Sequence, residues 1–117
     1  MKKIYFLKTC NTCVRILKEL NPSSEYILQD IKNEPITVKQ LEEMKALSGS
    51  YESLFSRRAK LYKEMGLKDQ KLEEADYKHY LLEHYTFLSR PVTIVENQIF
   101  IGNSKKTTEA TKLAINA

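Results

Sequence analysis

The first third of the chain alternates between short apolar runs and a stretch with helical spacing. Residues 3–7 contain the apolar run of residues 4–7, typical of a short strand buried in the centre of a sheet. Residues 14–20 continue at the spacing of an amphipathic helix, and residues 21–24 end it with a proline and two serines. Residues 25–30 hold a second strand. A strand–helix–strand unit of about 30 residues predicts two parallel strands joined by a crossover helix.

The middle of the chain has the pattern of helices. Thr37 is a good N-cap residue, and Gln40 three positions later completes a capping box. The apolar stripe behind this cap is formed by Val38, Leu41, Met44 and Leu47. After a break at residues 48–50, we expect a second helix over residues 51–65, ended by Gly66, and a third over residues 72–85.

In the last third of the chain the apolar residues recur at every second position, the spacing of a strand. Residues 92–95 and 98–101 predict strands, and the two residues between them, Glu96 and Asn97, predict a tight antiparallel hairpin. A last short helix is expected over residues 107–116.

The order of these elements predicts an α/β fold of the thioredoxin-like, glutaredoxin type: a mixed four-stranded sheet with an inserted helical subdomain. The chain of 117 residues is long enough for one domain with a real core and too short for two. We therefore expect a single domain over residues 1–117, with a core of about residues 1–34 and 88–117 and a helical insert of about residues 35–87.

Composition narrows the class of protein further. Apolar residues make up 42% and charged residues 29%, the balance of a soluble globular protein. The longest apolar run, residues 4–7, is too short to span a bilayer, and we expect a cytoplasmic protein without membrane association. The net charge of +4 permits anionic partners, but no groove-entering motif is present, so direct DNA binding is not expected.

The only two cysteines, Cys10 and Cys13, are the most informative feature of the chain. A cytosolic chain does not normally use one disulfide as a structural staple, and a loop this small would constrain the unfolded chain little. The pair therefore indicates reactivity or metal binding. Structural zinc needs four ligands, and His79 and His84 fall on different faces of one predicted helix, so we expect no metal site. Two inert buried cysteines are the remaining alternative.

Cys10 is our candidate nucleophile, because it lies where the first helix begins. Backbone N–H groups and the helix dipole favour negative charge there and lower the pKa of a thiol. Lys8 and Arg15 are expected to add positive potential. Cys13, one turn inside the helix, suits the role of a resolving thiol that closes a disulfide.

Two basic segments are candidates for anion binding. Arg90-Pro91 opens the third strand, where a thioredoxin-like fold has a cis-proline loop facing its thiol, and Arg90 would then lie beside Cys10. The plain alternative is a proline at the start of an edge strand. Arg57, Arg58 and Lys60 are predicted on the second insert helix, as a solvated basic face or with one cation over the thiol.

These residues resemble the arsenate reductase-like proteins, the ArsC/Spx family of thioredoxin-fold proteins with a helical insert. The similarity spans nearly the whole chain and rests on residues 4–13, 54–60, 62–67 and 87–92. It implies that Cys10 is the nucleophilic cysteine, that Arg90 is the arginine before a cis-proline, and that Arg58 is an insert arginine of the Spx-like branch. Contacts to substrate are then assigned to Lys8, Arg15, Arg57 and Pro91.

The chain also departs from parts of the family pattern. Glutaredoxin-dependent arsenate reductases carry their insert arginine near Ser56, a histidine near Phe6 and a third arginine near Gly102. They use a single catalytic cysteine, whereas Spx regulators carry the Cys-x-x-Cys pair as a redox switch. A regulator's contact loop has a glycine where this chain has Ser50. The unrelated phosphatase-like arsenate reductases need five residues between cysteine and arginine, and only four separate Cys10 from Arg15.

Two hypotheses follow from the residues and the resemblance. In the first, the protein is a thiol–disulfide oxidoreductase acting on arsenate or a mixed disulfide, with Arg58 and Arg90 stabilising the anion. It would hold no bound cofactor and would be reduced by thioredoxin, glutaredoxin or glutathione. In the second, the Cys10–Cys13 disulfide switches a surface that binds the RNA polymerase alpha subunit.

Overall fold

The computed structural model describes residues 1–117, which divide into two compact units. The first comprises residues 1–35 and 90–117, and the second comprises residues 36–89. Every helix in both is too short or too polar to cross a membrane.

The first unit contains a four-stranded mixed sheet, as predicted. Its strands are β1 (Lys2–Phe6), β2 (Ile27–Asp30), β3 (Val92–Val95) and β4 (Gln98–Ile101), in the spatial order β2-β1-β3-β4. β1 runs parallel to β2 and antiparallel to β3, and β3 and β4 form the expected hairpin. A parallel strand–helix–strand half thus joins an antiparallel hairpin half, and the predicted thioredoxin-like, mixed α/β fold is confirmed.

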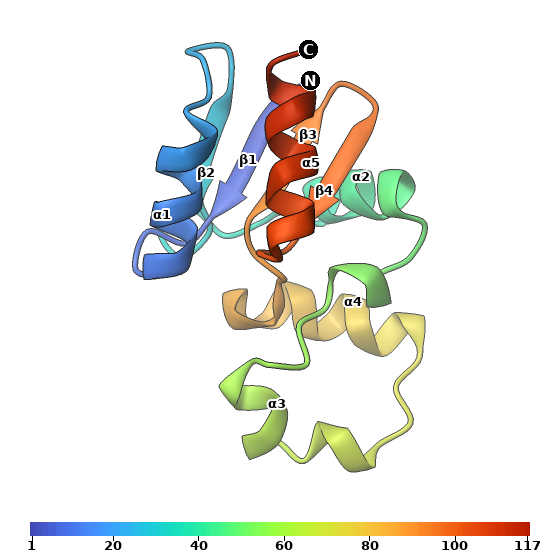
Figure 1. Cartoon of the computed structure of the whole chain (residues 1–117). Coiled ribbons are helices and arrows are strands. Elements are labelled where there is room, and N and C mark those ends of the chain that lie inside the picture. Colours follow the sequence, from blue (N-terminus) through green and yellow to red (C-terminus); the bar gives the residue numbers. More distant parts are fainter. The chain divides into compact units, whose positions relative to one another are not determined.

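Two helices of this unit, α1 (Asn11–Leu20) and α5 (Lys105–Ile115), lie side by side over one face of the sheet (Figure 1). Ile4, Tyr26 and Val95 are the buried residues of one core cluster there. The partly buried side chains that pack against this cluster are Leu17, Phe100, Ala114 and Ile115. The helix that begins at the cysteines is therefore anchored by its apolar face to the central strands.

The second unit begins with α2 (Val38–Ser48), whose predicted start and end are confirmed. Thr37 Oγ1 accepts the N–H of Gln40, and Gln40 Oε1 accepts the N–H of Thr37, both at 3.1 Å. Gly49 ends the helix with φ of +96°, a conformation that glycine adopts without steric cost. Of the predicted stripe, Leu41 and Met44 are buried and Leu47 is partly buried, but Val38, the first residue of the helix, is exposed.

The predicted helix over residues 51–65 is wrong. Only a 3-10 turn (Glu52–Leu54) and the short α3 (Lys60–Glu64) form there. Between them Phe55 is extended and pairs with Leu88 as an isolated β-bridge. The Ser56 N–H donates to the Phe87 carbonyl at 2.7 Å, and the Ser89 N–H donates to the Leu54 carbonyl at 2.8 Å. This nonlocal backbone pairing outweighs the local helical pattern.

The rest of the second unit is α4 (Glu74–Glu83), flanked by 3-10 turns at Leu67–Asp69 and Tyr85–Phe87. Phe55 is the centre of its aromatic cluster, with ring centroids 5.2 Å from Phe87, 5.0 Å from Tyr77 and 6.0 Å from Tyr62. The third helix, predicted over residues 72–85, is shorter than expected: it covers Glu74–Glu83, and a 3-10 turn over Tyr85–Phe87 follows it. Its apolar residues Tyr77 and Leu81 are buried.

Candidate active site

Cys10 lies at the junction of β1 and α1, as the sequence predicts. Its N–H donates to the Leu7 carbonyl at 3.0 Å, and its own carbonyl accepts the Val14 N–H at 3.0 Å. Cys10 is thus the N-cap residue of α1, with extended backbone dihedral angles. In this position its side chain lies at the helix end where backbone N–H groups have no carbonyl partner within the helix.

The two thiols have opposite protonation tendencies. Burial alone would raise the pKa of Cys10, but the backbone N–H groups of Cys13 and Thr12, the Cys13 side chain and the charge of Arg90 together hold it below its usual value. Burial is the main reason that the pKa of Cys13 is raised to about 11. The nearby Cys10 raises it further, while the Leu7 backbone and Arg90 oppose the shift. Cys10 is therefore the more readily formed thiolate.

The two cysteines also differ in solvent exposure, and Cys10 is again the more reactive of the two. Both are free thiols; Cys10 is half-buried, whereas Cys13 is 1% exposed. An external substrate can reach the Cys10 sulfur more easily than that of Cys13. This arrangement gives the two cysteines the accessibility expected of a nucleophile and a resolving thiol.

Arg90 is the cation of this unit that acts on both thiols, since its charge lowers the pKa of Cys10 and of Cys13. The Arg90–Pro91 peptide bond is cis, as predicted, and leads directly into β3. The structure therefore brings Cys10, Cys13 and Arg90 together from the beginning of α1 and the start of β3.

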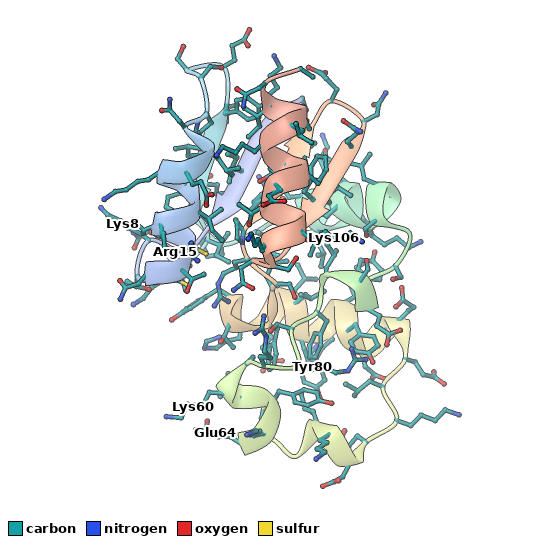
Figure 2. All side chains as sticks on the ribbon, viewed as in Figure 1. Lys8, Arg15, Lys60, Glu64, Tyr80 and Lys106 are labelled. Atoms are coloured by element: carbon teal, nitrogen blue, oxygen red, sulfur yellow. The ribbon has the colours of Figure 1, made fainter.

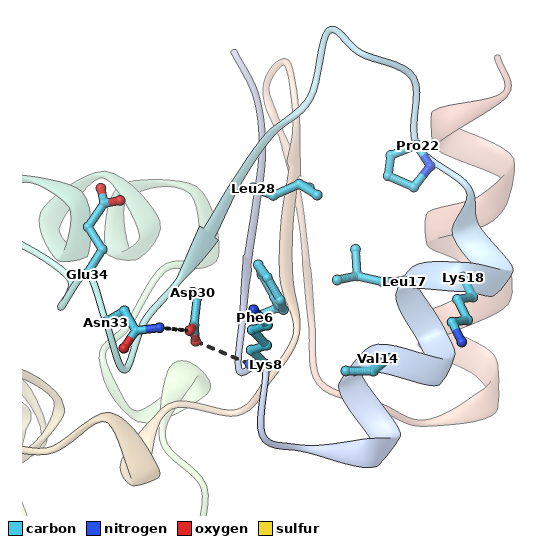
Figure 3. Close-up of a pocket in the computed structure, with 10 residues that line it drawn as sticks. All are labelled: Phe6, Lys8, Val14, Leu17, Lys18, Pro22, Leu28, Asp30, Asn33 and Glu34. Carbon is cyan, nitrogen blue, oxygen red and sulfur yellow. Dashed lines mark hydrogen bonds between the residues drawn. The ribbon is translucent and has the colours of Figure 1, made fainter.

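Lys8 and Arg15 are exposed at the end of the first unit where α1 begins (Figure 2). The Lys8 side chain lies at the rim of a groove of about 720 Å³ beside α1 (Figure 3). The apolar lining of this groove comes from Phe6, Val14, Leu17, Pro22 and Leu28. The predicted substrate contacts of Lys8 and Arg15 stay predictions.

Asp30 is a residue of this region that sequence reasoning missed. Its Oδ1 accepts the backbone N–H of Lys8 at 3.2 Å, and its Oδ2 accepts a hydrogen bond from the Asn33 amide at 2.7 Å (Figure 3). Asp30 thus anchors the loop that leads to Cys10. The sequence feature that could have identified Asp30 is its position at the end of the second strand, because the parallel register places it opposite Phe6.

Arg57 and Arg58 belong to the second unit and lie in the segment before α3, not on a helix as predicted. The Arg57 Nη2 donates to Glu52 Oε2 at 2.6 Å and to the Tyr77 hydroxyl at 2.9 Å. The hydrogen bond to Glu52 is the main reason that the pKa of Arg57 is raised. Arg58 is exposed, and its backbone N–H donates to Ser56 Oγ at 3.3 Å. The basic side chains of this segment therefore have different surroundings.

The two histidines take part in local contacts within the second unit. His79 Nε2 lies 2.7 Å from Glu83 Oε2, and His84 Nδ1 accepts the Thr86 N–H at 3.2 Å. The chain contains no cluster of three or more histidine, cysteine or acidic side chains suited to hold a metal ion.

Solved structures with the same fold extend over almost the whole chain. The YFFB (PA3664) protein is 20% identical, with a TM-score of 0.79 and a match that covers 98% of this chain and 99% of that one. Arsenate reductase from Vibrio cholerae is 20% identical, with a TM-score of 0.73 and coverage of 97% and 96%. Protein SACOL0876 from Staphylococcus aureus COL is 25% identical, with a TM-score of 0.71 and coverage of 94% and 97%.

Among curated proteins, none has a sequence that matches significantly. The sequence does match the model of one protein family, ArsC, over residues 5–111. This match includes the end of β1 from residue 5, the cysteine pair, the whole helical unit and the hairpin after Arg90. The chain therefore belongs to the ArsC family.

Proposed function

We propose that this protein is a cytoplasmic thiol–disulfide oxidoreductase in which Cys10 is the nucleophile and Cys13 the resolving thiol. The observation that carries the proposal is the asymmetry of the pair: one half-buried thiol with a lowered pKa next to a buried thiol with a pKa of about 11. Membership of the ArsC family supports thiol-based redox chemistry. A reducing compartment such as the cytoplasm would keep the pair as a dithiol between turnovers.

Arsenate is the substrate that we propose to test first. The Cys10 thiolate would attack pentavalent arsenic and displace a hydroxyl group, which leaves as water after protonation. Cys13 would then attack the Cys10 sulfur, so that the sulfur–arsenic electron pair stays with arsenic. Arsenate and two thiols thereby give arsenite, one disulfide and one water, a two-electron exchange that uses no prosthetic group.

The cations have separate roles in this proposal. Arg90 would stabilise the Cys10 thiolate and the bound anion, because its charge already acts on both sulfurs. A second anion contact is assigned to Arg58 on its resemblance to the insert arginine of the Spx-like branch. Lys8 and Arg15 would add positive potential for the approach of an anion.

The test is arsenate-dependent NADPH oxidation, coupled separately to thioredoxin and to glutathione with glutaredoxin. Cys10→Ser should abolish turnover with both donors, because serine has no thiol to form the nucleophilic thiolate. Cys13→Ser should abolish turnover with thioredoxin, and any remaining turnover should require glutathione. Equal rates in the wild type and Cys10→Ser would contradict the proposal, and inactivity of the wild type with both donors would remove arsenate as the substrate.

A redox-switched regulator is the second candidate, favoured by the same contact between two free thiols. The Cys10–Cys13 disulfide would then change binding to the RNA polymerase alpha subunit. Ser50, where Spx regulators have glycine, accepts the Ser53 N–H with its hydroxyl at 3.1 Å. Pull-down with the alpha subunit, reduced and oxidised, tests this role; no binding in either state would remove it.

A further inference from the structure

The reduced cysteine pair also has the features of a ligand site. Cys10 and Cys13 are three residues apart at the start of α1, so both side chains lie on one face of the helix. The Cys13 side chain forms a hydrogen bond with the Cys10 sulfur. Two free sulfur atoms are therefore held within reach of one bound atom before any ligand arrives.

The number of sulfur atoms selects the kind of ligand. The chain has two cysteines, whereas structural zinc is held by four ligands. Trivalent arsenic forms three bonds and keeps a hydroxyl group when two of them go to sulfur. Cys13 is buried and Cys10 is half-buried, so the third bond of an atom held by both would point toward solvent.

Charge further favours a neutral ligand over a cation. The positive charge of Arg90 acts on both sulfurs and opposes a bound cation. A metal cation would also require both thiols as thiolates, whereas Cys13 keeps its proton to a pKa of about 11. Arsenous acid is neutral, and its hydroxyl groups can take up the thiol protons as they leave.

We propose that the reduced Cys10–Cys13 pair binds trivalent arsenic as a neutral two-sulfur adduct. Two sulfur–arsenic bonds form and two arsenic–oxygen bonds break. Each displaced hydroxyl leaves as water with one thiol hydrogen, so that arsenous acid and the dithiol give the adduct and two waters. No electron is transferred, and arsenic stays trivalent.

The adduct would compete with the disulfide for the same two sulfurs. Binding itself requires only the reduced pair. One consequence rests on the proposed function: if the protein reduces arsenate, arsenite is its product and should inhibit turnover by occupying both thiols. Arsenite would then also protect Cys10 and Cys13 from oxidation.

The experiment titrates sodium arsenite into the reduced full-length protein by calorimetry and identifies the adduct by non-denaturing mass spectrometry. We expect one arsenic per chain and loss of both thiols from alkylation by iodoacetamide. Cys13→Ser and Cys13→Ala should each bind at least about 100-fold more weakly, because the second bond is no longer intramolecular. Thr12→Ser keeps both thiols and serves as the matched control, with affinity close to that of the wild type.

Circular dichroism of each variant ensures that a loss of binding is not a loss of fold. Equal affinity in the wild type and both Cys13 variants would overturn the proposal, as would Zn²⁺ binding more tightly than arsenite. An arsenite adduct in a protein without arsenate turnover supports the proposal and removes only arsenate as the substrate of the proposed oxidoreductase. Arsenate turnover without any arsenite adduct overturns the proposal and leaves the reductase function intact.

Discussion

Strand ladders organise the unit of residues 1–35 and 90–117, whereas side-chain packing around one isolated β-bridge organises the unit of residues 36–89. In the first, four strands form continuous hydrogen-bonded ladders, and α1 and α5 cover one face. In the second, short helices and turns surround an aromatic cluster and are closed by side-chain caps. The thiol pair therefore lies on an element anchored to a sheet, while the insert arginines lie on a segment without regular structure.

The aromatic cluster gives the largest expected effect on stability. Phe87 is 1% exposed and its ring stacks on that of Phe55. The ring centroids of Phe87 and Tyr80 are 5.6 Å apart. Phe87→Ala should lower the free energy of unfolding by about 3–5 kcal/mol, the cost of a large cavity in a core. Urea denaturation measures this; Tyr85→Ala, at a partly exposed position of the same turn, is the control. An effect below 1 kcal/mol would mean that side-chain packing does not hold this unit.

The buried thiol of the first unit should make stability depend on alkaline pH. The pKa of Cys13 is about 11 in the folded chain, against 9.0 for an unperturbed thiol. As the pH rises from 9.0 toward 11, the unfolded chain loses this proton and the folded chain keeps it, so the free energy of unfolding falls. Cys10 has the opposite effect below pH 9.0. Its pKa in the folded chain is lowered, so the free energy of unfolding rises as the folded chain loses this proton first.

The measurement is the difference in unfolding free energy between the wild type and Cys13→Ala as a function of pH. Groups away from the pair titrate alike in both proteins. The variant lacks the hydrogen bond from the Cys13 side chain to Cys10, so below pH 9.0 the difference also contains the titration of Cys10. The wild type should lose stability relative to the variant above pH 9.0. A difference that is flat up to pH 11 would contradict the burial of this thiol.

Arg90 should affect reactivity more than stability. Its charge favours the Cys10 thiolate, so Arg90→Gln should raise the pKa of Cys10 and slow its alkylation at neutral pH several-fold. The pH profile of alkylation by iodoacetamide should shift to higher pH, while the rate at its alkaline plateau stays the same. Arg90→Lys should retain part of the effect. An unchanged profile in Arg90→Gln would mean that the backbone N–H groups and the Cys13 side chain lower this pKa without Arg90.

The capping box of α2 gives the smallest effect, since it lies on the surface of the second unit. Thr37→Ala removes the acceptor of the Gln40 N–H and should cost about 1 kcal/mol. Thr37→Ser keeps a hydroxyl and should cost less. Thermal unfolding of the two variants measures the contribution. A larger loss in Thr37→Ser than in Thr37→Ala would exclude hydrogen bonding as its source.

Features that depend on neighbouring residues could be predicted from the sequence. The capping box of Thr37, the hairpin across Glu96 and Asn97, and the start of a helix at Cys10 were all predicted and are present. Each rests on one local device: a side-chain cap, a two-residue turn or a change of hydrophobic period. The order of these elements was enough to predict the thioredoxin-like sheet.

Features that depend on distant segments were decided by the tertiary structure. Phe55 has residues of helical pattern on both sides but pairs with Leu88, 33 positions away, and this breaks the predicted helix. Arg57 is held by Glu52 and Tyr77, contacts that no periodicity indicates. Cys10 and Cys13 acquire different pKa values because burial, Arg90 and backbone N–H groups act on them unequally. The sequence by itself indicated the reactive pair and the helix start that favours the Cys10 thiolate. Packing added the burial of Cys13 and the charge of Arg90, because solvation depends on the whole fold.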